Sequence, residues 1–162
     1  MLPGPMLIKR CDACDGLFKQ RTLTSGNTCG ATFWTDGKMG APMLPRTPLL
    51  IRCPHCSSIL WTKSLREVDS YPTYRGFLIF EDDEAVGNSK RAAIERKEKA
   101  YESLPFFALA TFEDLNAFAD GAGLSSEEEL IVRRQAWLTG NDSRRHSDSP
   151  SPLTSGEEAI FL

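Results

Sequence analysis

The stretch LLIRCPHCSSIL, residues 49–60, contains the pattern that decides how this chain folds. Its Cys-Pro-His-Cys segment is compatible with two kinds of chemistry. Thiol–disulfide oxidoreductases use such a cysteine pair for redox reactions, whereas metal-binding turns use it to present two thiolates to one ion. The rest of the sequence favours one of these interpretations.

A second copy of the pattern lies earlier in the chain, in LIKRCDACDGLF at residues 7–18. Both copies place apolar and basic residues before Cys-x-x-Cys, and small or polar residues and an apolar pair after it. At an offset of 42 positions, Cys11 corresponds to Cys53 and Cys14 to Cys56. Two such turns facing each other would place four thiolates at the corners of a tetrahedron, as a structural zinc ion requires.

The segment between the two copies contains a hairpin signal. In ATFWTDGKMGAPML, the dipeptide Asp36-Gly37 is a typical two-residue turn, with Phe33-Trp34 before it and Met39 after it. We therefore expect a β-hairpin here, which would allow the two cysteine turns to meet.

This arrangement resembles the zinc ribbon family over roughly residues 6–66. The resemblance implies that one zinc ion is bound by four ligands: Cys11, Cys14, Cys53 and Cys56. It also implies that SSILWTK forms the final strand. Family members usually have glycine after the second cysteine of each turn, in a left-handed conformation. This chain has Asp15 and Ser57 there, so we expect slight strain in the second turn.

Four thiolates and Zn²⁺ together carry two negative charges. Basic residues next to the ligands would offset this charge: Lys9, Arg10 and Arg52. Zinc binding can contribute about 10–16 kcal/mol, which would stabilise a unit with little material for an apolar core.

The redox interpretation would make Cys53 the nucleophile and His55 the group that lowers its pKa. A thioredoxin-like fold needs a helix after the motif, but SSILWTKSLREVDSYP starts with residues typical of a strand. It also leaves the first cysteine pair unexplained. We therefore favour zinc and keep redox as the less favoured alternative. His55 is then expected to be an exposed residue that is not a ligand, and Cys29 a free thiol.

Charge is distributed unevenly along the chain, whose net charge is −3. Residues 1–80 carry +5 and all five cysteines, whereas residues 81–162 carry −8. This contrast predicts a zinc ribbon with a β-hairpin at 1–80 and an acidic α-helical region at 81–140. No apolar run approaches the ~20 residues that span a membrane, and the N-terminus has no secretory pattern. We therefore expect a cytoplasmic protein with reduced thiols.

After the ribbon, the sequence predicts a strand at 76–82 and then a helix at 88–104, which Pro105 ends. Capping boxes at Thr111–Asp114 and Ser125–Glu128 predict two further helices, which end near Gly121 or Gly123 and near Gly140 or Asn141. The buried face of the last helix is expected to contain Leu130, Ile131, Arg134, Trp137 and Leu138. Residues 141–162, including His146, are expected to form a flexible tail ending in an incomplete helix.

The predicted fold class is therefore α+β, with a small antiparallel β zinc ribbon followed by helices. This layout resembles uncharacterised bacterial proteins with an N-terminal zinc ribbon and a helical remainder. The sequence contains no phosphate-binding loop, no His-Glu-x-x-His and no Gly-x-Ser-x-Gly. The carboxylates Asp82, Asp83 and Glu84 are interpreted as the entry of a helix and not as a cation site.

We predict a non-catalytic zinc-binding protein that acts as an adaptor for a protein partner. The alternative is nucleic-acid binding through a basic and aromatic face of the ribbon. The residues that would form this face are Lys38, Arg46, Arg52, Lys63, Arg66, Phe33, Trp34 and Trp61.

Overall fold

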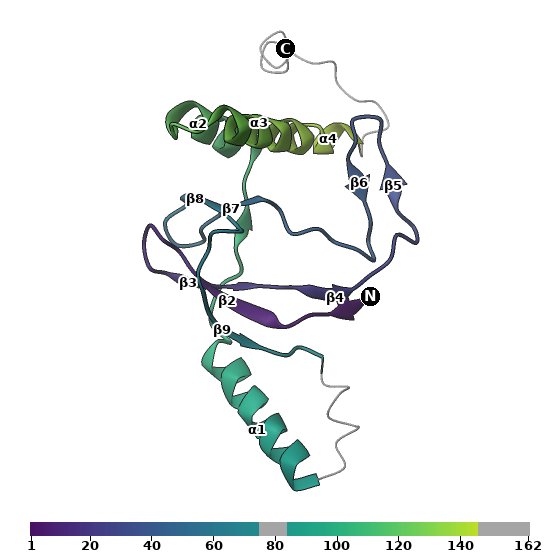
Figure 1. The fold of residues 1–162 in the computed structure, drawn as a ribbon, viewed down its shortest axis with the longest axis vertical. Helices are drawn as coiled ribbons and strands as arrows, with labels where there is room; N and C mark the ends of the chain where they lie inside the picture. Colours follow the sequence, from purple (N-terminus) through teal and green to yellow (C-terminus); the bar gives the residue numbers. More distant parts are fainter. Residues whose placement is uncertain (75–83, 146–162) are drawn as a thin grey trace. The chain divides into compact units, whose positions relative to one another are not determined.

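The computed structural model describes residues 1–74 and 84–145, except for the side chains of residues 84–86, 143 and 144. Contacts group the chain into two compact units, Met1–Leu109 and Ala110–Leu162. The named strands all lie in the first unit and pair antiparallel, and helices make up the described part of the second (Figure 1). The predicted α+β class is confirmed.

Two β-hairpins hold the two cysteine turns. Strand β2 (Met6–Arg10) pairs with β3 (Leu17–Gln20), and β7 (Leu50–Arg52) pairs with β8 (Ile59–Trp61). The register is the same at the two turns, because Arg10 lies opposite Leu17 and Arg52 lies opposite Ile59. Both pairs differ by the same 42 positions as the cysteines. The repeat in the sequence is therefore also a repeat in the structure.

Each hairpin gains a third strand from a distant part of the chain. Strand β9 (Glu67–Tyr71) pairs with β2, and β10 (Ala108–Leu109) pairs with β7. The segment SSILWTK forms a strand, β8, as predicted, but β9 and β10 follow it and extend the two hairpins beyond residue 66. The sequence of β9, EVDSY, is largely polar and gives little strand signal, so its pairing with β2 decides its conformation.

The predicted hairpin between the cysteine turns is confirmed. Strand β5 (Thr32–Phe33) pairs with β6 (Met39–Gly40), and Gly37 has a φ of 82° in the turn between them. The backbone N–H of Lys38 donates to the Asp36 carboxylate at 3.0 Å, as expected of an Asp-Gly turn. A fourth strand pair joins β1 (Leu2–Pro3) to β4 (Leu23–Ser25).

The core of the first unit includes two of the cysteines. Its buried cluster consists of Cys11, Phe18, Ile51, Cys53, Leu60 and Leu65, with Phe107 packed against it. Phe18 and Ile51 have no exposed surface. Because the cysteines and the apolar side chains form one cluster, a metal held by the sulfurs would stabilise the core directly.

Helix α1 (Glu84–Ala100) begins and ends four residues earlier than predicted. Residues after Ala100 form a turn in which Leu104 N–H donates to Tyr101 O at 3.2 Å. The end of the helix contacts β9, because the side chains of Lys97 and Tyr101 both donate to the Asp69 carboxylate. The boundary between the units therefore lies at 109/110, whereas the composition changes near residue 80. The strand predicted at 76–82 lies outside the described residues.

The contact between α1 and β9 should weaken in acid. The Lys97 ammonium is the main cause that holds the pKa of Asp69 below its usual value. A lowered pKa means that the carboxylate stabilises the fold above its unfolded pKa of about 3.9, and that this contribution is lost as the pH falls through the lower, folded value. Lys97 is half-exposed, so solvent screening limits the effect to about 1 kcal/mol or less.

We expect Asp69→Asn to increase hydrogen exchange in the last turns of α1 at pH 7, and to remove the acid-dependent loss of protection that we expect in the natural chain. Asp12→Asn, in the first cysteine turn, serves as the control and should leave this exchange unchanged. Equal protection of α1 in the two variants would contradict the assigned contact.

The second unit is a pair of helices, α2 (Phe112–Gly121) and α3 (Ser126–Gly140), followed by the short α4 (Asp142–Arg145). Both predicted capping boxes are present, with Thr111 and Ser125 as the N-cap residues, and Asn141 caps the end of α3. None of the described helices combines the length and the apolar character that a membrane span needs. The predicted tail beyond residue 145 lies outside the described residues.

The prediction for the buried face of α3 is wrong in part. Its buried residues are Val132 and Ala136, whereas Leu130 is 69% exposed and Arg134 is also exposed. Small and β-branched side chains one turn apart face the interior of this helix pair, which buries only a narrow stripe. The prediction selected the largest apolar side chains and therefore did not include the two residues that are buried.

Candidate metal centre

The structure brings together the four cysteines that the sequence selected. The sulfur atoms of Cys11, Cys14, Cys53 and Cys56 all lie within 4.8 Å of one another. Cys11 and Cys53, the first residue of each turn, are buried, while Cys14 and Cys56 are exposed. The four-cysteine cluster therefore extends from the buried core to the protein surface.

The distances between the sulfurs fit a zinc ion. In a tetrahedron with Zn–S of about 2.3 Å, neighbouring sulfurs are about 3.8 Å apart. The Sγ atoms of Cys11 and Cys56 are 3.7 Å apart, and those of Cys14 and Cys53 are 3.8 Å apart. These distances far exceed the ~2.05 Å of a disulfide. The four cysteines could thus hold one metal ion in tetrahedral sulfur coordination.

The two turns have the same backbone conformation. Asp15 and Ser57 have φ values of 57° and 64°, the left-handed conformation expected at this position. In the first turn, the Asp15 N–H donates to Cys11 O at 2.9 Å, and in the second, the Ser57 N–H donates to Cys53 O at 3.1 Å. The chain reverses tightly in both cases, so each second cysteine returns toward the first.

Because Ser57 has a side chain in a left-handed conformation, replacing it with glycine should relieve strain. We expect Ser57→Gly to raise the free energy of unfolding of the metal-loaded protein by up to about 1 kcal/mol. Ser57→Ala keeps a Cβ at this position and should give no such gain. The comparison requires urea unfolding of both variants, and a Ser57→Gly protein no more stable than Ser57→Ala would contradict the argument.

The metal-free site cannot hold four thiolates side by side. The Gly16 N–H lowers the pKa of Cys14, but the neighbouring thiols, chiefly that of Cys56, outweigh it and raise that pKa to about 12. The Ser58 hydroxyl and backbone lower the pKa of Cys56 to about 6. Burial raises the pKa of Cys11. A divalent cation would favour the deprotonated forms, so binding would release protons and would weaken as the pH falls.

Basic residues next to the site are themselves paired with carboxylates. Lys9 Nζ lies 3.7 Å from Glu67, and the Arg10 guanidinium lies 3.6 Å from Asp15. That Lys9 and Arg10 offset the charge of a bound metal stays a prediction.

His55 joins the two turns. Its Nε2 lies 2.8 Å from the Leu17 carbonyl oxygen, and since a carbonyl only accepts, His55 is the donor. The ring lies over Gly16, where an added Cβ would come within 2.5 Å of the His55 Cδ2 atom. His55 is exposed, as predicted, but its cross-turn contact was missed. The sequence signal that could have indicated this contact is Gly16, because a residue without a side chain leaves room for a ring to pack over it.

The redox pattern occurs in a setting different from that of a thioredoxin-like site. Cys53 and Cys56 lie in the turn between β7 and β8, not at the beginning of a helix. Cys53 Sγ accepts a hydrogen bond from the His55 backbone N–H at 3.4 Å. Its neighbours are the sulfurs of the first turn, which the redox interpretation left unused.

The other candidate residues lie apart from the sulfur cluster. Cys29 is exposed and is not part of it. Asp82, Asp83 and His146 lie outside the described residues, and Glu84 begins α1.

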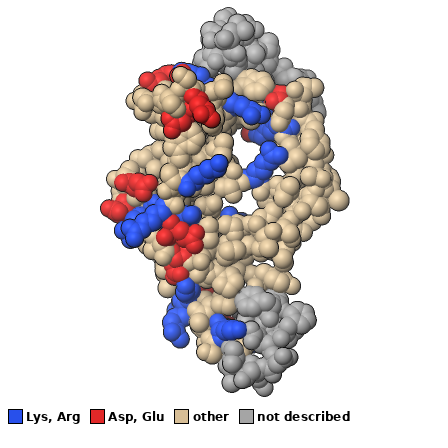
Figure 2. All heavy atoms as spheres, viewed as in Figure 1, with Lys and Arg blue, Asp and Glu red and all other residues tan. Residues whose placement is uncertain are grey.

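The aromatic residues proposed for nucleic-acid binding differ in exposure. Phe33 is 70% exposed, whereas Trp34 and Trp61 are half-buried, and the Trp34 ring lies over Gly40. On the face of the N-terminal unit that Figure 2 draws, acidic side chains lie beside basic ones.

None of the protein-family models, curated proteins or solved structures compared with this chain matches it. The class of site therefore rests on the chain itself: a four-cysteine cluster, held by two equivalent turns in an antiparallel β region, that is consistent with a zinc-ribbon-like metal centre.

Proposed function

We propose that this chain is a non-catalytic zinc protein, in which one structural Zn²⁺ bound by four cysteines holds together an interaction module for a protein partner. One observation carries the proposal: all four sulfurs lie within 4.8 Å of one another at distances that suit tetrahedral zinc. A site with four protein thiolates has no open position for a substrate or a catalytic water, which supports a structural role.

The position of the ligands supports the same role. Two of the four belong to the buried core, and the hairpins that carry them are joined to each other by the His55–Leu17 contact. The metal would replace much of the apolar core that a small β unit lacks. Hairpins held together in this way would form a rigid β surface.

Exposed apolar side chains support a role in protein binding. On the first unit, Phe33 and Leu109 are each 70% exposed, although both lie in strands. Large exposed apolar side chains are typical of surfaces that bind partners when they gather into a patch, and are unremarkable when scattered.

The proposal is tested by metal analysis and nucleic-acid binding on the same sample. Metal analysis should give one zinc per chain, and Co²⁺ substitution should give the absorption bands of a tetrahedral thiolate site. At low salt, labelled single-stranded DNA and RNA should not bind. Binding that weakens steeply with salt, and weakens further in Lys63→Glu, would instead favour the nucleic-acid alternative.

A further inference from the structure

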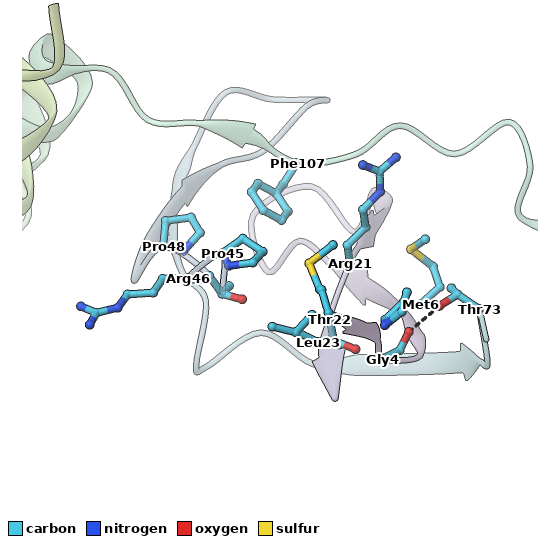
Figure 3. Close-up of a pocket in the computed structure, with 13 residues that line it drawn as sticks. Gly4, Met6, Arg21, Thr22, Leu23, Pro45, Arg46, Pro48, Thr73 and Phe107 are labelled. Atoms are coloured by element: carbon cyan, nitrogen blue, oxygen red, sulfur yellow. Dashed lines mark hydrogen bonds between the residues drawn. The ribbon is translucent and has the colours of Figure 1, made fainter. Parts of the chain in front are cut away.

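The first unit contains a pocket on a part of its surface distinct from the sulfur cluster. Its volume is about 590 Å³, within the 300–1,000 Å³ usual for ligand sites. Segments distant in the sequence form its walls: the N-terminal residues, residues 21–23, the loop 45–48, Thr73 and Phe107 (Figure 3).

The walls of this pocket are mainly apolar. They include Met1, Pro3, Met6, Leu23 and Phe107. Two of the threonines that line it have partners within the protein: Thr22 Oγ1 donates to Pro5 O and Thr73 Oγ1 donates to Gly4 O, both at 2.6 Å. These hydroxyl protons are therefore not available to a ligand, and the pocket mainly offers apolar contact.

Among the described residues, the charged side chains that line the pocket are those of Arg21 and Arg46, and none of the lining side chains is acidic. Arg21 and Arg46 are both exposed, and within the described part of the chain the ion pairs involve other side chains. Arg21 is positioned by the Phe106 ring, whose centroid lies 4.6 Å from its guanidinium carbon. Figure 3 shows the two arginine side chains extending from different sides of the pocket, with Phe107 between them.

We propose that this pocket binds a peptide segment of a partner protein in which apolar side chains are flanked on both sides by carboxylates. The inference rests on the proposed adaptor function, and it specifies which kind of peptide the partner would present. The apolar walls would hold the central side chains, and each arginine would pair with a carboxylate on its own side. A nucleic acid would satisfy the arginines but not the apolar walls.

The experiment uses the full chain, with its zinc content measured, and a fluorescein-labelled peptide in which Leu-Phe-Leu is flanked by two glutamates on each side. Fluorescence anisotropy should show saturable binding that weakens as salt rises. Arg21→Glu and Arg46→Glu should each weaken it at least about tenfold. Arg66→Glu is the matched control, because Arg66 is also exposed but does not line the pocket, and it should bind like the natural chain.

A peptide with lysines in place of the glutamates should not bind. Equal affinity of Arg46→Glu and Arg66→Glu would overturn the proposal, as would binding to phosphatidylserine vesicles but not to the acidic peptide. A sample with one zinc per chain that fails to bind the acidic peptide would refute this inference alone. A sample without zinc would refute the metal centre, whatever the peptide result.

Discussion

Replacing Cys53 with serine should abolish zinc binding and unfold the N-terminal unit. Cys53 is 1% exposed and belongs to the core cluster, so its loss removes a ligand and a buried contact together. Structural zinc contributes about 10–16 kcal/mol in small domains. Whole domains are stable by only about 5–15 kcal/mol. The free energy lost with the metal should therefore exceed the free energy of unfolding of this unit.

The measurement is zinc per chain by atomic absorption, together with the near-ultraviolet circular dichroism of the tryptophans in the first unit. Cys11→Ser should behave like Cys53→Ser, since the two cysteines occupy equivalent positions in the repeat. Cys29→Ser is the matched control and should keep its zinc and its spectrum, because Cys29 is exposed and outside the cluster. A folded Cys53→Ser protein without zinc would show that the metal does not hold the fold together.

Phe18→Ala should cost about 3–5 kcal/mol of unfolding free energy in the zinc-loaded protein. Phe18 has no exposed surface and lies in one buried cluster with Ile51 and Leu60. Truncation would remove its burial and leave a cavity next to two cysteines, so we also expect weaker zinc retention. Urea unfolding at fixed zinc concentration measures the first effect, and competition with a chelator measures the second.

Phe33→Ala is the comparison for this variant, because it deletes the same ring from a side chain that is 70% exposed. Its effect should lie within about 0.5 kcal/mol, as for most surface substitutions. Similar costs for the two variants would show that Phe18 is not part of a tightly packed core.

The features that could be predicted from the sequence depend on local chemistry. The repeated Cys-x-x-Cys turn selected the four sulfurs that converge in the structure. Asp36-Gly37 predicted the hairpin, and the Thr111–Asp114 and Ser125–Glu128 pairs predicted where two helices begin. In each case a few adjacent residues determine the backbone conformation, so one sequence is sufficient to recognise it.

The features that could not be predicted depend on pairing between distant segments. Strands β9 and β10 have weak strand patterns and are ordered by β2 and β7. The direction in which α3 faces depends on α2, so Val132 is buried although Leu130 is larger and exposed. The contact between His55 and Leu17 joins two turns that are far apart in the chain. None of these partners can be identified from a local pattern.

X-ray absorption at the zinc edge of the purified natural chain tests the central claim most directly, because it counts the ligands and identifies their elements. We expect one zinc per chain with a single shell of four sulfurs at about 2.3 Å. A shell that includes nitrogen or oxygen, or a folded protein that contains no zinc, would contradict the account.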